Sequence, residues 1–392
     1  MGPARLLDLT RLMSRWGRGP MTGVDRVEFA YLTQVLAMDT PAFGLVRSAL
    51  GFLLLDLAGM RLLLADLPPM AQPDLIGRIA YRRDRLRATA EAVLRRAAVA
   101  RCPRRGLRRM LLRHLPAGGS YFNVGHANLD AATFRQLRDA GWSITVLVHD
   151  TIPLDHPEFA RPGSVEAFRR KMRVVAQQAD RVIHTTQAAR AATEAQFARF
   201  GRVPPGVVAP LGVPVPKPVP QELPFVPQPP YFLCLGTIEP RKNHLMLLDV
   251  WQNLPAPVPQ LYIVGRRGWS NVAVFDRLDH LPSDAPIHEV AGLSDGAVAA
   301  LLQGTQALLF PSFAEGFGLP AVEAAALGTP VIASDLAAFR EILGENAVYL
   351  EASDSYSWLE TIRGWTKPRA LTDTVKIPPS WGVHFMIIFD QV

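Results

Sequence analysis

The fold class is decided by residues 310–323, which read F-P-S-F-A-E-G-F-G-L-P-A-V-E. The apolar residues 307–310 form a short run that ends before a proline, and this pattern predicts a buried strand. Residues 319–327 are strong helix formers followed by a glycine, which predicts a helix with proline in its first turn. The E-G-F-G sequence between them then joins the carboxyl end of a strand to a helix start. In an open α/β sheet, ligands bind at such turns, and the free N–H groups of the helix start attract anions.

The same turn carries two carboxylates that can face one ligand. Glu315 lies in the turn and Glu323 about one turn inside the predicted helix, while Gly316 and Gly318 let the backbone approach a bulky ligand. Carboxylates accept hydrogen bonds from sugar hydroxyls, and the N–H groups between them suit a diphosphate. The combination suggests a nucleotide sugar. The alternative is an ordinary strand-turn-helix with surface glutamates, which this motif alone does not exclude.

The length and composition predict a two-domain globular protein. A chain of 392 residues is too long for one ordinary core, and 49% of its residues are hydrophobic and 20% charged. Cys102 and Cys234 are far apart and have no metal or redox spacing, so we expect a reduced, cytoplasmic setting. The N-terminus lacks a signal-peptide core, and charged residues interrupt the apolar stretch 49–67, so no membrane span is expected.

Charge is divided unequally between the two halves of the chain. Residues 1–202 contain 31 Lys or Arg and 17 Asp or Glu, whereas residues 203–392 contain 11 and 18. Most of the excess lies in residues 78–113, which hold 13 arginines against two acids and have apolar residues at roughly helical spacing. Intrahelical pairing cannot use so many arginines, so we expect an anionic partner, in particular a phospholipid leaflet. A solvated helical face is the alternative. No nucleic-acid motif accompanies the segment, so no nucleic-acid partner is expected.

The first half alternates strand and helix patterns. Strands are expected at residues 6–10, 120–125, 143–148 and 181–186, and helices at 27–36, 129–140 and 168–179. A basic, glycine-containing loop follows the first strand and includes Thr22 and Gly23, but it does not match a dinucleotide fingerprint. His149 and Asp150 follow the continuous apolar strand, so they point into the crevice at the carboxyl edge of the sheet. A structural role for a lone histidine is the alternative.

A proline-rich stretch separates the halves. Residues 203–230 contain 11 prolines, which break regular elements and stiffen a connector. Within this stretch, residues 207–209 could still form the last strand of the first half. A new α/β series follows, with strands expected at residues 231–235, 261–264, 287–290, 307–310 and 331–333, and helices at 244–251 and 295–303. We therefore expect two doubly wound, Rossmann-like domains, residues 1–202 and 231–378, joined by the linker 203–230, with a ligand held between them.

Two adjacent cations lie in the first loop of this second series. Arg241 and Lys242 precede the predicted helix that begins at His244. At a helix start, a guanidinium can bind a diphosphate bidentately and an ammonium can bind it as a point charge. The alternative is a solvated basic pair without a ligand.

Four motifs of the second half match a known family in sequence and order. They are G-T-I-E-P-R-K-N-H at residues 236–244, V-A-G-L-S-D at 290–295, P-S-F-A-E-G-F-G-L-P-A-V-E-A at 311–324 and G-T-P-V-I-A-S-D at 328–335. These motifs resemble the retaining glycosyltransferases of the GT-B fold, family 4, also called glycosyl transferases group 1, and among them bacterial mannosyltransferases. The first half is similar only through T-G-V-D-R-V at 22–27 and V-H-D-T-I-P-L at 148–154.

The resemblance implies a role for each matching residue. Arg241 and Lys242 would hold the donor's diphosphate, Glu315 would contact sugar hydroxyls near the anomeric carbon, and Glu323 would bind the donor ribose. His149 would lie near the sugar on the opposite wall of the cleft. The donor side would also include Gly236, Thr237, Gly265, Arg266, Gly316, Phe317 and Gly318, with Gly265 and Arg266 near the nucleobase. The acceptor side would include Thr22, Gly23 and Asp150.

The resemblance also implies a mechanism, and it implies which domain binds the donor and which binds the acceptor. Such enzymes retain the anomeric configuration, and positive charge on the departing diphosphate is the main catalytic contribution. The chain has no D-x-D triplet, so no metal or other cofactor is expected. The first domain would bind the acceptor and the second the nucleotide sugar. Residues 379–392 would form a helix that crosses back to the first domain, although residues 367–379 are short and irregular for the family.

The sequence thus predicts transfer of a hexose, mannose in particular, to a polysaccharide or a lipid-linked oligosaccharide. The expected place is the cytoplasm, at the inner face of the plasma membrane, where anionic lipids attract basic segments. One alternative is a catalytically silent subunit that binds a nucleotide sugar or scaffolds a membrane assembly. A sugar-nucleotide epimerase or a phosphorylase is another, but the paired motifs E-P-R-K and E-G-F-G-L-P-x-x-E argue against both.

Overall fold

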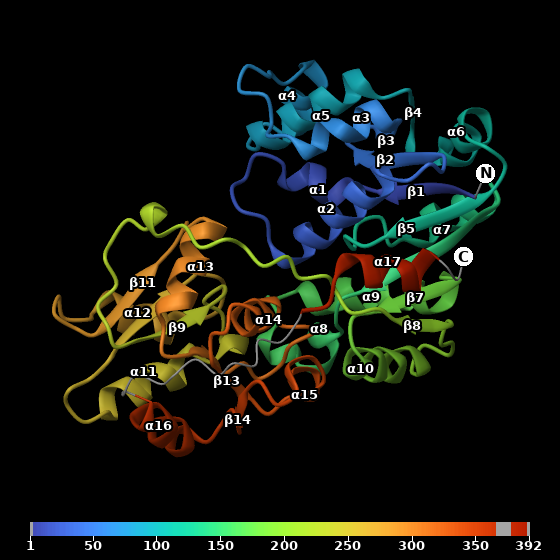
Figure 1. Ribbon diagram of the computed structural model, residues 1–392. Helices are drawn as coiled ribbons and strands as arrows, with labels where there is room; N and C mark the ends of the chain where they lie inside the picture. The colour runs from blue at the N-terminus through green and yellow to red at the C-terminus, as the bar shows by residue number, and fades with distance from the viewer. Residues whose placement is uncertain (1–2, 366–377, 390–392) are drawn as a thin grey trace.

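The first half of the chain forms one large, mainly parallel sheet. A computed structural model describes residues 3–365 and 378–389. The eight strands follow the order β4-β3-β2-β1-β5-β6-β7-β8, with β3 antiparallel to both of its neighbours (Figure 1). They are β1 (Ala4–Asp8), β2 (Ala42–Ser48), β3 (Gly51–Leu55), β4 (Ala100–Cys102), β5 (Gly119–Asn123), β6 (Trp142–Val148), β7 (Arg181–His184) and β8 (Gly206–Val208).

Helices cover both faces of this sheet. Leu6 and Leu7 of β1 point to opposite faces of the sheet, and both are covered. Leu7 packs in one apolar cluster with α2 and α5, and Leu6 packs in another with α6, α7 and α9. The helices are α1 (Thr10–Arg15), α2 (Gly23–Leu36), α3 (Leu57–Arg61), α4 (Leu75–Ala80), α5 (Arg85–Ala97), α6 (Leu107–His114), α7 (Ala131–Arg138), α8 (Ile152–Asp155), α9 (Ser164–Gln178) and α10 (Gln187–Ala198).

The second half forms a separate six-stranded sheet that is entirely parallel. Its order is β11-β10-β9-β12-β13-β14. The strands are β9 (Tyr231–Leu235), β10 (Gln260–Val264), β11 (Ile287–Val290), β12 (Leu308–Phe310), β13 (Val331–Ser334) and β14 (Val348–Leu350). The helices are α11 (His244–Asn253), α12 (Val272–Asp279), α13 (Asp295–Gly304), α14 (Leu319–Ala326), α15 (Ala337–Leu343) and α16 (Ser355–Gly364). The two sheets confirm the predicted class of two doubly wound halves.

The structure adds elements that the sequence patterns did not reveal. The apolar stretch 49–67 is not one segment, because it contains β3, α3 and a 3-10 turn at residues 62–64. In the described part of the chain, every helix is too short or too polar to cross a membrane. By contrast, strand β8 confirms the strand considered possible at residues 207–209 within the expected linker, and it pairs in parallel with β7. The stretch after it contains a short 3-10 turn at residues 220–222.

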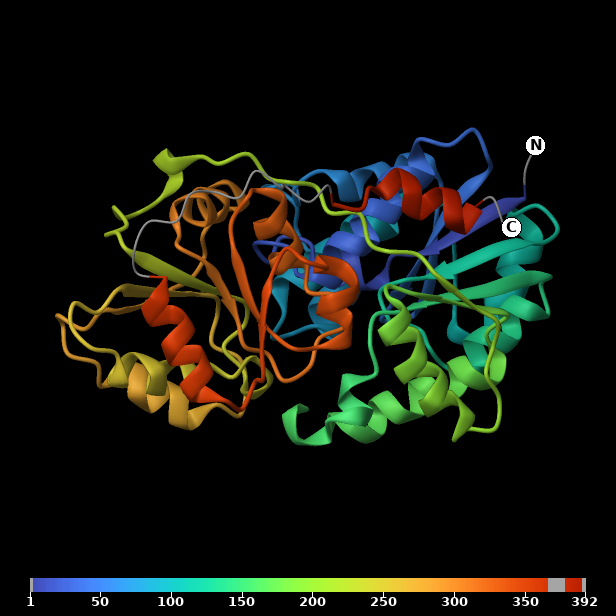
Figure 2. The same ribbon diagram turned by 60° about the horizontal axis from the view of Figure 1, so that its bottom comes forward.

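A helix from the end of the chain packs against the first half. Figure 2 shows α17 (Trp381–Phe389) beside α2, far from the strands that precede it in the sequence. Its His384 is buried, with Nε2 2.8 Å from the Tyr31 hydroxyl oxygen, and the rings of Phe385 and Tyr31 lie 5.0 Å apart. This helix occupies the segment expected to cross back. Residues 366–377, most of the stretch expected to be irregular, and residues 390–392 lie outside the described ranges.

Candidate active site

The turn after β12 places a carboxylate at the edge of the second sheet. β12 ends at Phe310, and α14 begins at Leu319 with a proline in its first turn. Gly318 has a φ of +84°, and a Cβ on it would lie 2.6 Å from the ring of Phe339, so only glycine fits there. The predicted strand, turn and helix are all present, with Glu315 in the turn and the buried Phe317 anchoring it.

Arg241 and Lys242 converge on Glu315. Both cations lie in a 3-10 turn, residues 240–242, between β9 and α11. Nη1 of Arg241 lies 2.7 Å and Nζ of Lys242 lies 2.5 Å from Oε1 of Glu315. Nη2 of Arg241 also lies 2.8 Å from Oε1 of Glu239, a buried residue that the sequence reasoning left unassigned although it lies in the E-P-R-K motif. Two cations and two carboxylates therefore form one cluster.

Charge rather than burial determines the ionisation of Glu315. Burial alone would raise the pKa of its carboxyl group, but the charges of Arg241 and Lys242 outweigh burial and lower that pKa to about 2. Glu315 is therefore ionised at neutral pH. The ammonium of Lys242 also lies 4.2 Å from the centroid of the Phe310 ring, which holds the cation at the end of β12.

The carboxyl edges of the two sheets meet at Gly316. A Cβ on Gly316 would lie 2.6 Å from the carbonyl oxygen of His149 and 3.0 Å from Cβ of Asp150, the two residues that follow β6. Thr185, which follows β7, donates a hydrogen bond of 3.4 Å to the carbonyl oxygen of Gly316. The structure thus brings His149 and Asp150 from the first half to the turn that carries Glu315.

His149 is held as a neutral ring beside this turn. Its Nε2 lies 2.7 Å from the carbonyl oxygen of Val124, so this nitrogen carries the proton and donates. Burial lowers the pKa of His149 to about 4, although the hydrogen bond to Val124 opposes that effect. The ring of His126 packs against it, with centroids 5.1 Å apart. A neutral ring leaves Nδ1 able to accept a hydrogen bond. Burial also raises the pKa of the neighbouring Asp150.

The loops after β9 and β10 are too closely packed for side chains at their glycines. A Cβ on Gly265 would lie 1.8 Å from the carbonyl oxygen of Gly236, and a Cβ on Gly236 would lie 3.3 Å from Cε of Lys242. In the same way, a Cβ on Gly268 would lie 2.7 Å from the methyl group of Thr237. These loops therefore offer backbone groups next to Lys242, as the donor-side prediction requires. The position of Arg266 beside a nucleobase stays a prediction; in the structure its guanidinium lies near Gly19 of the first half.

Glu323 is contacted from the opposite half. Nη2 of Arg26 in α2 lies 2.6 Å from Oε1 of Glu323 in α14. Burial raises the pKa of Glu323, and the charge of Arg26 opposes that effect. Gly23 lies against Leu319, and the N–H and the hydroxyl of Thr22 both donate hydrogen bonds to Oδ2 of Asp25 at the start of α2. The sequence reasoning missed Arg26, although it is the fifth residue of T-G-V-D-R-V.

A cavity of about 300 Å³ adjoins the charged cluster. Trp269 bounds it from the second half, and its Nε1 donates a hydrogen bond of 3.1 Å to the carbonyl oxygen of Phe159 in the first. The guanidinium of Arg161 lies 4.4 Å from the ring centroid of Trp269. The cavity is also lined by Asp150, Glu239, Arg241 and Glu315. Among the residues that the structure describes, no three His, Cys, Asp or Glu side chains are grouped as metal ligands would be.

The second half of the chain matches a described protein family. Residues 217–371 match the family model described as glycosyl transferases group 1, and this range contains Arg241, Lys242, Glu315 and Glu323. Residues 217–371 form a group 1 glycosyltransferase domain. The recognition made from the motifs is therefore confirmed for this domain.

Two curated proteins that are similar to part of this chain are named as mannosyltransferases. The serotype-specific mannosyltransferase WbdA of Escherichia coli is 30% identical over 247 residues, which are 58% of this chain and 30% of that protein. The O-antigen chain mannosyltransferase B of Escherichia coli is 32% identical over 127 residues, 32% of this chain and 33% of that protein. The matched region thus spans about a third of the length of each relative.

A solved structure shows that the likeness extends over both halves. The structure of Anabaena HepE in complex with UDP-glucose covers 93% of this chain and 89% of its own, with a TM-score of 0.59 at 15% identity. The glycosyltransferase domain and the first half together therefore have the GT-B fold.

Proposed function

We propose that this protein is a retaining glycosyltransferase that moves mannose from a nucleotide-diphosphate donor to a polysaccharide or lipid-linked oligosaccharide. One observation carries the proposal: Arg241 and Lys242 converge within 2.7 Å on Glu315 at the point where the carboxyl edges of both sheets meet. The two cations are fixed at a strand-loop-helix junction. Their charge matches a diphosphate leaving group better than it matches the single carboxylate that they contact in the structure.

The two cations would act on the departing nucleotide. A diphosphate brings more negative charge than Glu315 does, so it would compete for Arg241 and Lys242 and free that carboxylate to accept hydrogen bonds from sugar hydroxyls. As the bond between the anomeric carbon of the donor sugar and the diphosphate breaks, negative charge develops on the phosphate oxygens next to these cations. Donors already positioned for a developing charge contribute about 3 to 4 kcal/mol each to such a step.

The first half would supply the opposite wall. Neutral His149 would accept a hydrogen bond from a sugar hydroxyl, and Glu323 would hold the donor ribose once Arg26 yields or shares its oxygens. The acceptor would enter past Thr22, Gly23 and Asp150. The hydroxyl oxygen of the acceptor would bond to the anomeric carbon on the face from which the phosphate leaves, and the leaving phosphate would take up the proton of that hydroxyl. Attack on this face retains the anomeric configuration.

The choice of mannose and of acceptor draws support from the relatives. Both curated relatives are named as mannosyltransferases, and one as acting on the O-antigen chain. The HepE complex with UDP-glucose supports a nucleotide-sugar donor on this fold. We place the reaction in the cytoplasm and propose that it needs no metal, so that activity should persist in excess EDTA.

Turnover tests the proposal directly. Purified protein would be incubated with GDP-mannose or other nucleotide sugars and a lipid-linked or polysaccharide acceptor, with release of nucleotide as the readout and NMR of the anomeric proton of the product. Acceptor-dependent release with an α product from an α donor is expected. Donor binding without release under all acceptors would instead indicate a silent, nucleotide-sugar-binding subunit.

A further inference from the structure

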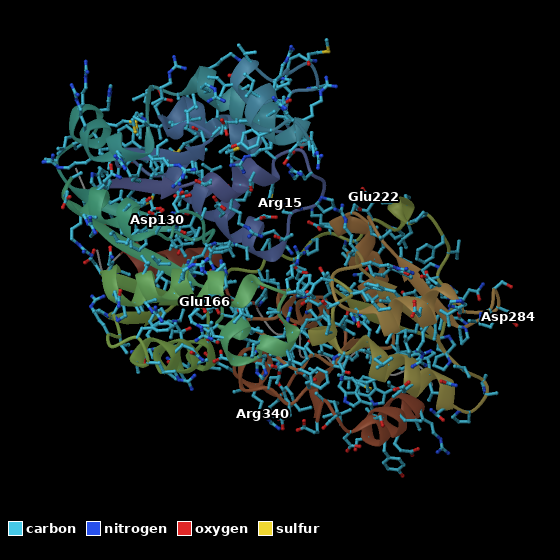
Figure 3. The ribbon with its side chains drawn as sticks, turned by 180° about the vertical axis from the view of Figure 1, so that it is seen from behind. Arg15, Asp130, Glu166, Glu222, Asp284 and Arg340 are labelled. Atoms are coloured by element: carbon cyan, nitrogen blue, oxygen red, sulfur yellow. The ribbon has the colours of Figure 1, made fainter. Side chains whose placement is uncertain are left out.

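Residues 75–113, called here the arginine-rich segment, cover the outer edge of the first sheet. The segment comprises α4, α5, the edge strand β4 and α6. These elements lie along one side of the first half, away from the glycosyltransferase domain (Figure 1). Figure 3 shows the same side from behind, with nitrogen-tipped side chains projecting from it into solvent. This side takes no part in the candidate active site.

Most of the arginines in the segment have no acidic partner among the described residues. Four of the thirteen have side-chain contacts within the protein. Arg95 pairs with Asp74 at 2.8 Å and with Glu91 at 2.7 Å, and Arg87 lies over the ring of Tyr81. Arg85 donates a hydrogen bond to Oε1 of Gln72, and Arg108 donates one to the carbonyl oxygen of Asp139. Both acids of the segment are also used, since Glu91 is fully buried and Asp84 contacts Arg18. The exposed arginines that form no ion pair with a described carboxylate are Arg78, Arg82, Arg83, Arg85, Arg96, Arg101, Arg104, Arg105, Arg108, Arg109 and Arg113.

Large apolar side chains are exposed between these arginines. Leu75 is 73% exposed, Ile79 61% and Leu112 51%. Leu75 and Ile79 are four residues apart in α4, so they share one face of the helix. Leu86 and Val99 are exposed as well, at 42% and 48%. Single exposed leucines are ordinary, but their concentration among unpaired cations indicates a partner with an apolar interior beneath an anionic layer.

We propose that the arginine-rich segment binds the surface of an anionic phospholipid bilayer. The arginines would contact lipid phosphates, and Leu75, Ile79 and Leu112 would enter the boundary with the acyl chains. A nucleic-acid duplex would use the arginines but not the exposed Leu75, Ile79 and Leu112. Single-stranded nucleic acid also fits less well, because its bases stack on exposed aromatic rings. Tyr81 is the only aromatic residue of the segment, and its hydroxyl is already bonded to Glu91 at 2.8 Å.

This placement would bring the acceptor side of the cleft close to the lipid. A cavity of about 600 Å³ lies between the loop that leads to Thr22 and residues 63–67, and its apolar walls include Trp16, Phe29, Leu63 and Leu67. Gly17 of this loop packs against Leu67 and Leu86, the latter in α5. An acceptor with an apolar anchor in the same bilayer would reach the cleft beside this cavity. This consequence rests on the proposed function, whereas membrane binding does not.

Vesicle co-sedimentation of the full chain, without donor, tests the proposal. The probes are phosphatidylcholine vesicles with and without phosphatidylglycerol at about 0.15 M salt, where the Debye length is short enough to suppress weak surface attraction. The first variant is Arg78→Gln with Arg82→Gln and Arg83→Gln. Its charge-matched control is Arg170→Gln with Arg173→Gln and Arg199→Gln, which changes exposed arginines of α9 and the end of α10.

The wild type and the control should sediment with phosphatidylglycerol vesicles only, and the first variant should bind them at least roughly tenfold more weakly. Equal losses in both triple variants, or a wild type that stays in solution, would overturn the proposal. Ile79→Ser removes an exposed apolar side chain without changing the charge, so it should weaken vesicle binding while leaving retention on heparin unchanged. Vesicle binding that survives Ile79→Ser, together with equally tight binding of duplex DNA, would show a general polyanion site instead.

Discussion

At the scale of single residues, Glu315 depends on the two cations beside it. Its side chain is only 9% exposed, and yet Arg241 and Lys242 lower its pKa to about 2, below the ordinary value of 4.5. Part of this arrangement was predictable, because the sequence placed Glu315 and the Arg-Lys pair at two strand ends of one parallel sheet. Their contact across 73 residues, and the second carboxylate at Glu239, depend on loop conformation that no local pattern encodes.

The depressed pKa of Glu315 makes its contribution to stability dependent on pH. Because the folded pKa lies below the unfolded one, the contribution is present above pH 4.5 and is lost as the pH falls toward 2. Glu315→Gln should therefore lower the free energy of unfolding by up to about 3 kcal/mol at pH 6, and by much less near pH 3. Urea unfolding of both proteins at the two pH values measures this. If the difference in free energy of unfolding between the two proteins were the same at both pH values, Glu315 would not have this low pKa.

Arg26 should matter more to stability than a neighbouring arginine in an exposed pair. Arg26 contacts the side chain of Glu323, which is 9% exposed, whereas Arg18 contacts that of Asp84, which is 40% exposed. Arg26→Gln leaves a buried carboxylate without its cation and should cost about 1 to 3 kcal/mol, while Arg18→Gln should cost less than about 1 kcal/mol. Thermal unfolding compares the two variants. Equal effects would show that the contact between the halves is not maintained in solution.

At the scale of elements, the second half was more predictable than the first. Five of its six strands are short apolar runs that end at glycine-rich or polar loops, and the pattern of hydrophobicity predicted them. The sixth, β14, was not predicted. The hairpin of β2 and β3 went unrecognised because its apolar residues run on into α3 without a turn signal in the pattern. Strand β8 lies among prolines that a connector would also contain.

Gly316 sets the distance between the carboxyl edges of the two sheets. A Cβ there would lie 2.6 Å from the carbonyl oxygen of His149, which is backbone and cannot rotate away. Gly316→Ala should therefore separate the turn from β6 and reduce transferase activity roughly a hundredfold, since small displacements of positioned groups are costly. Gly364→Ala is the matched control, because a Cβ at Gly364 meets nothing within 4 Å. Retained activity in both variants would show that this contact is dispensable.

At the scale of the whole molecule, α17 fastens the end of the second half to the first. Tyr31 is fully buried between α17 and the first sheet, and burial lowers the pKa of its partner His384 to about 4. Only the family resemblance predicted that this helix crosses to the first half. A nine-residue apolar segment does not by itself indicate the surface against which it packs. The pairing of Arg26 with Glu323 was out of reach for the same reason: it requires the relative orientation of the halves.

Removal of α17 should uncouple the two halves. Each half has a sheet and buried residues of its own, so a chain ending at residue 378 should unfold in two calorimetric transitions where the complete chain unfolds in one. The transition of the first half should also move to lower temperature, because Tyr31 and its neighbours become exposed. A single, unshifted transition in the shortened chain would mean that the direct contacts between the sheets are sufficient.

Donor binding by the wild type and by Arg241→Ala tests whether the cluster around Glu315 holds the donor's diphosphate. Isothermal titration with GDP-mannose, UDP-glucose and the free nucleoside diphosphates would be made on both proteins, with circular dichroism to show that the variant is folded. The arrangement of Arg241, Lys242 and Glu315 predicts that the wild type binds one diphosphate donor and that Arg241→Ala binds it at least roughly tenfold more weakly. Equal affinity in the two folded proteins would contradict the assignment of this cluster to the donor's diphosphate.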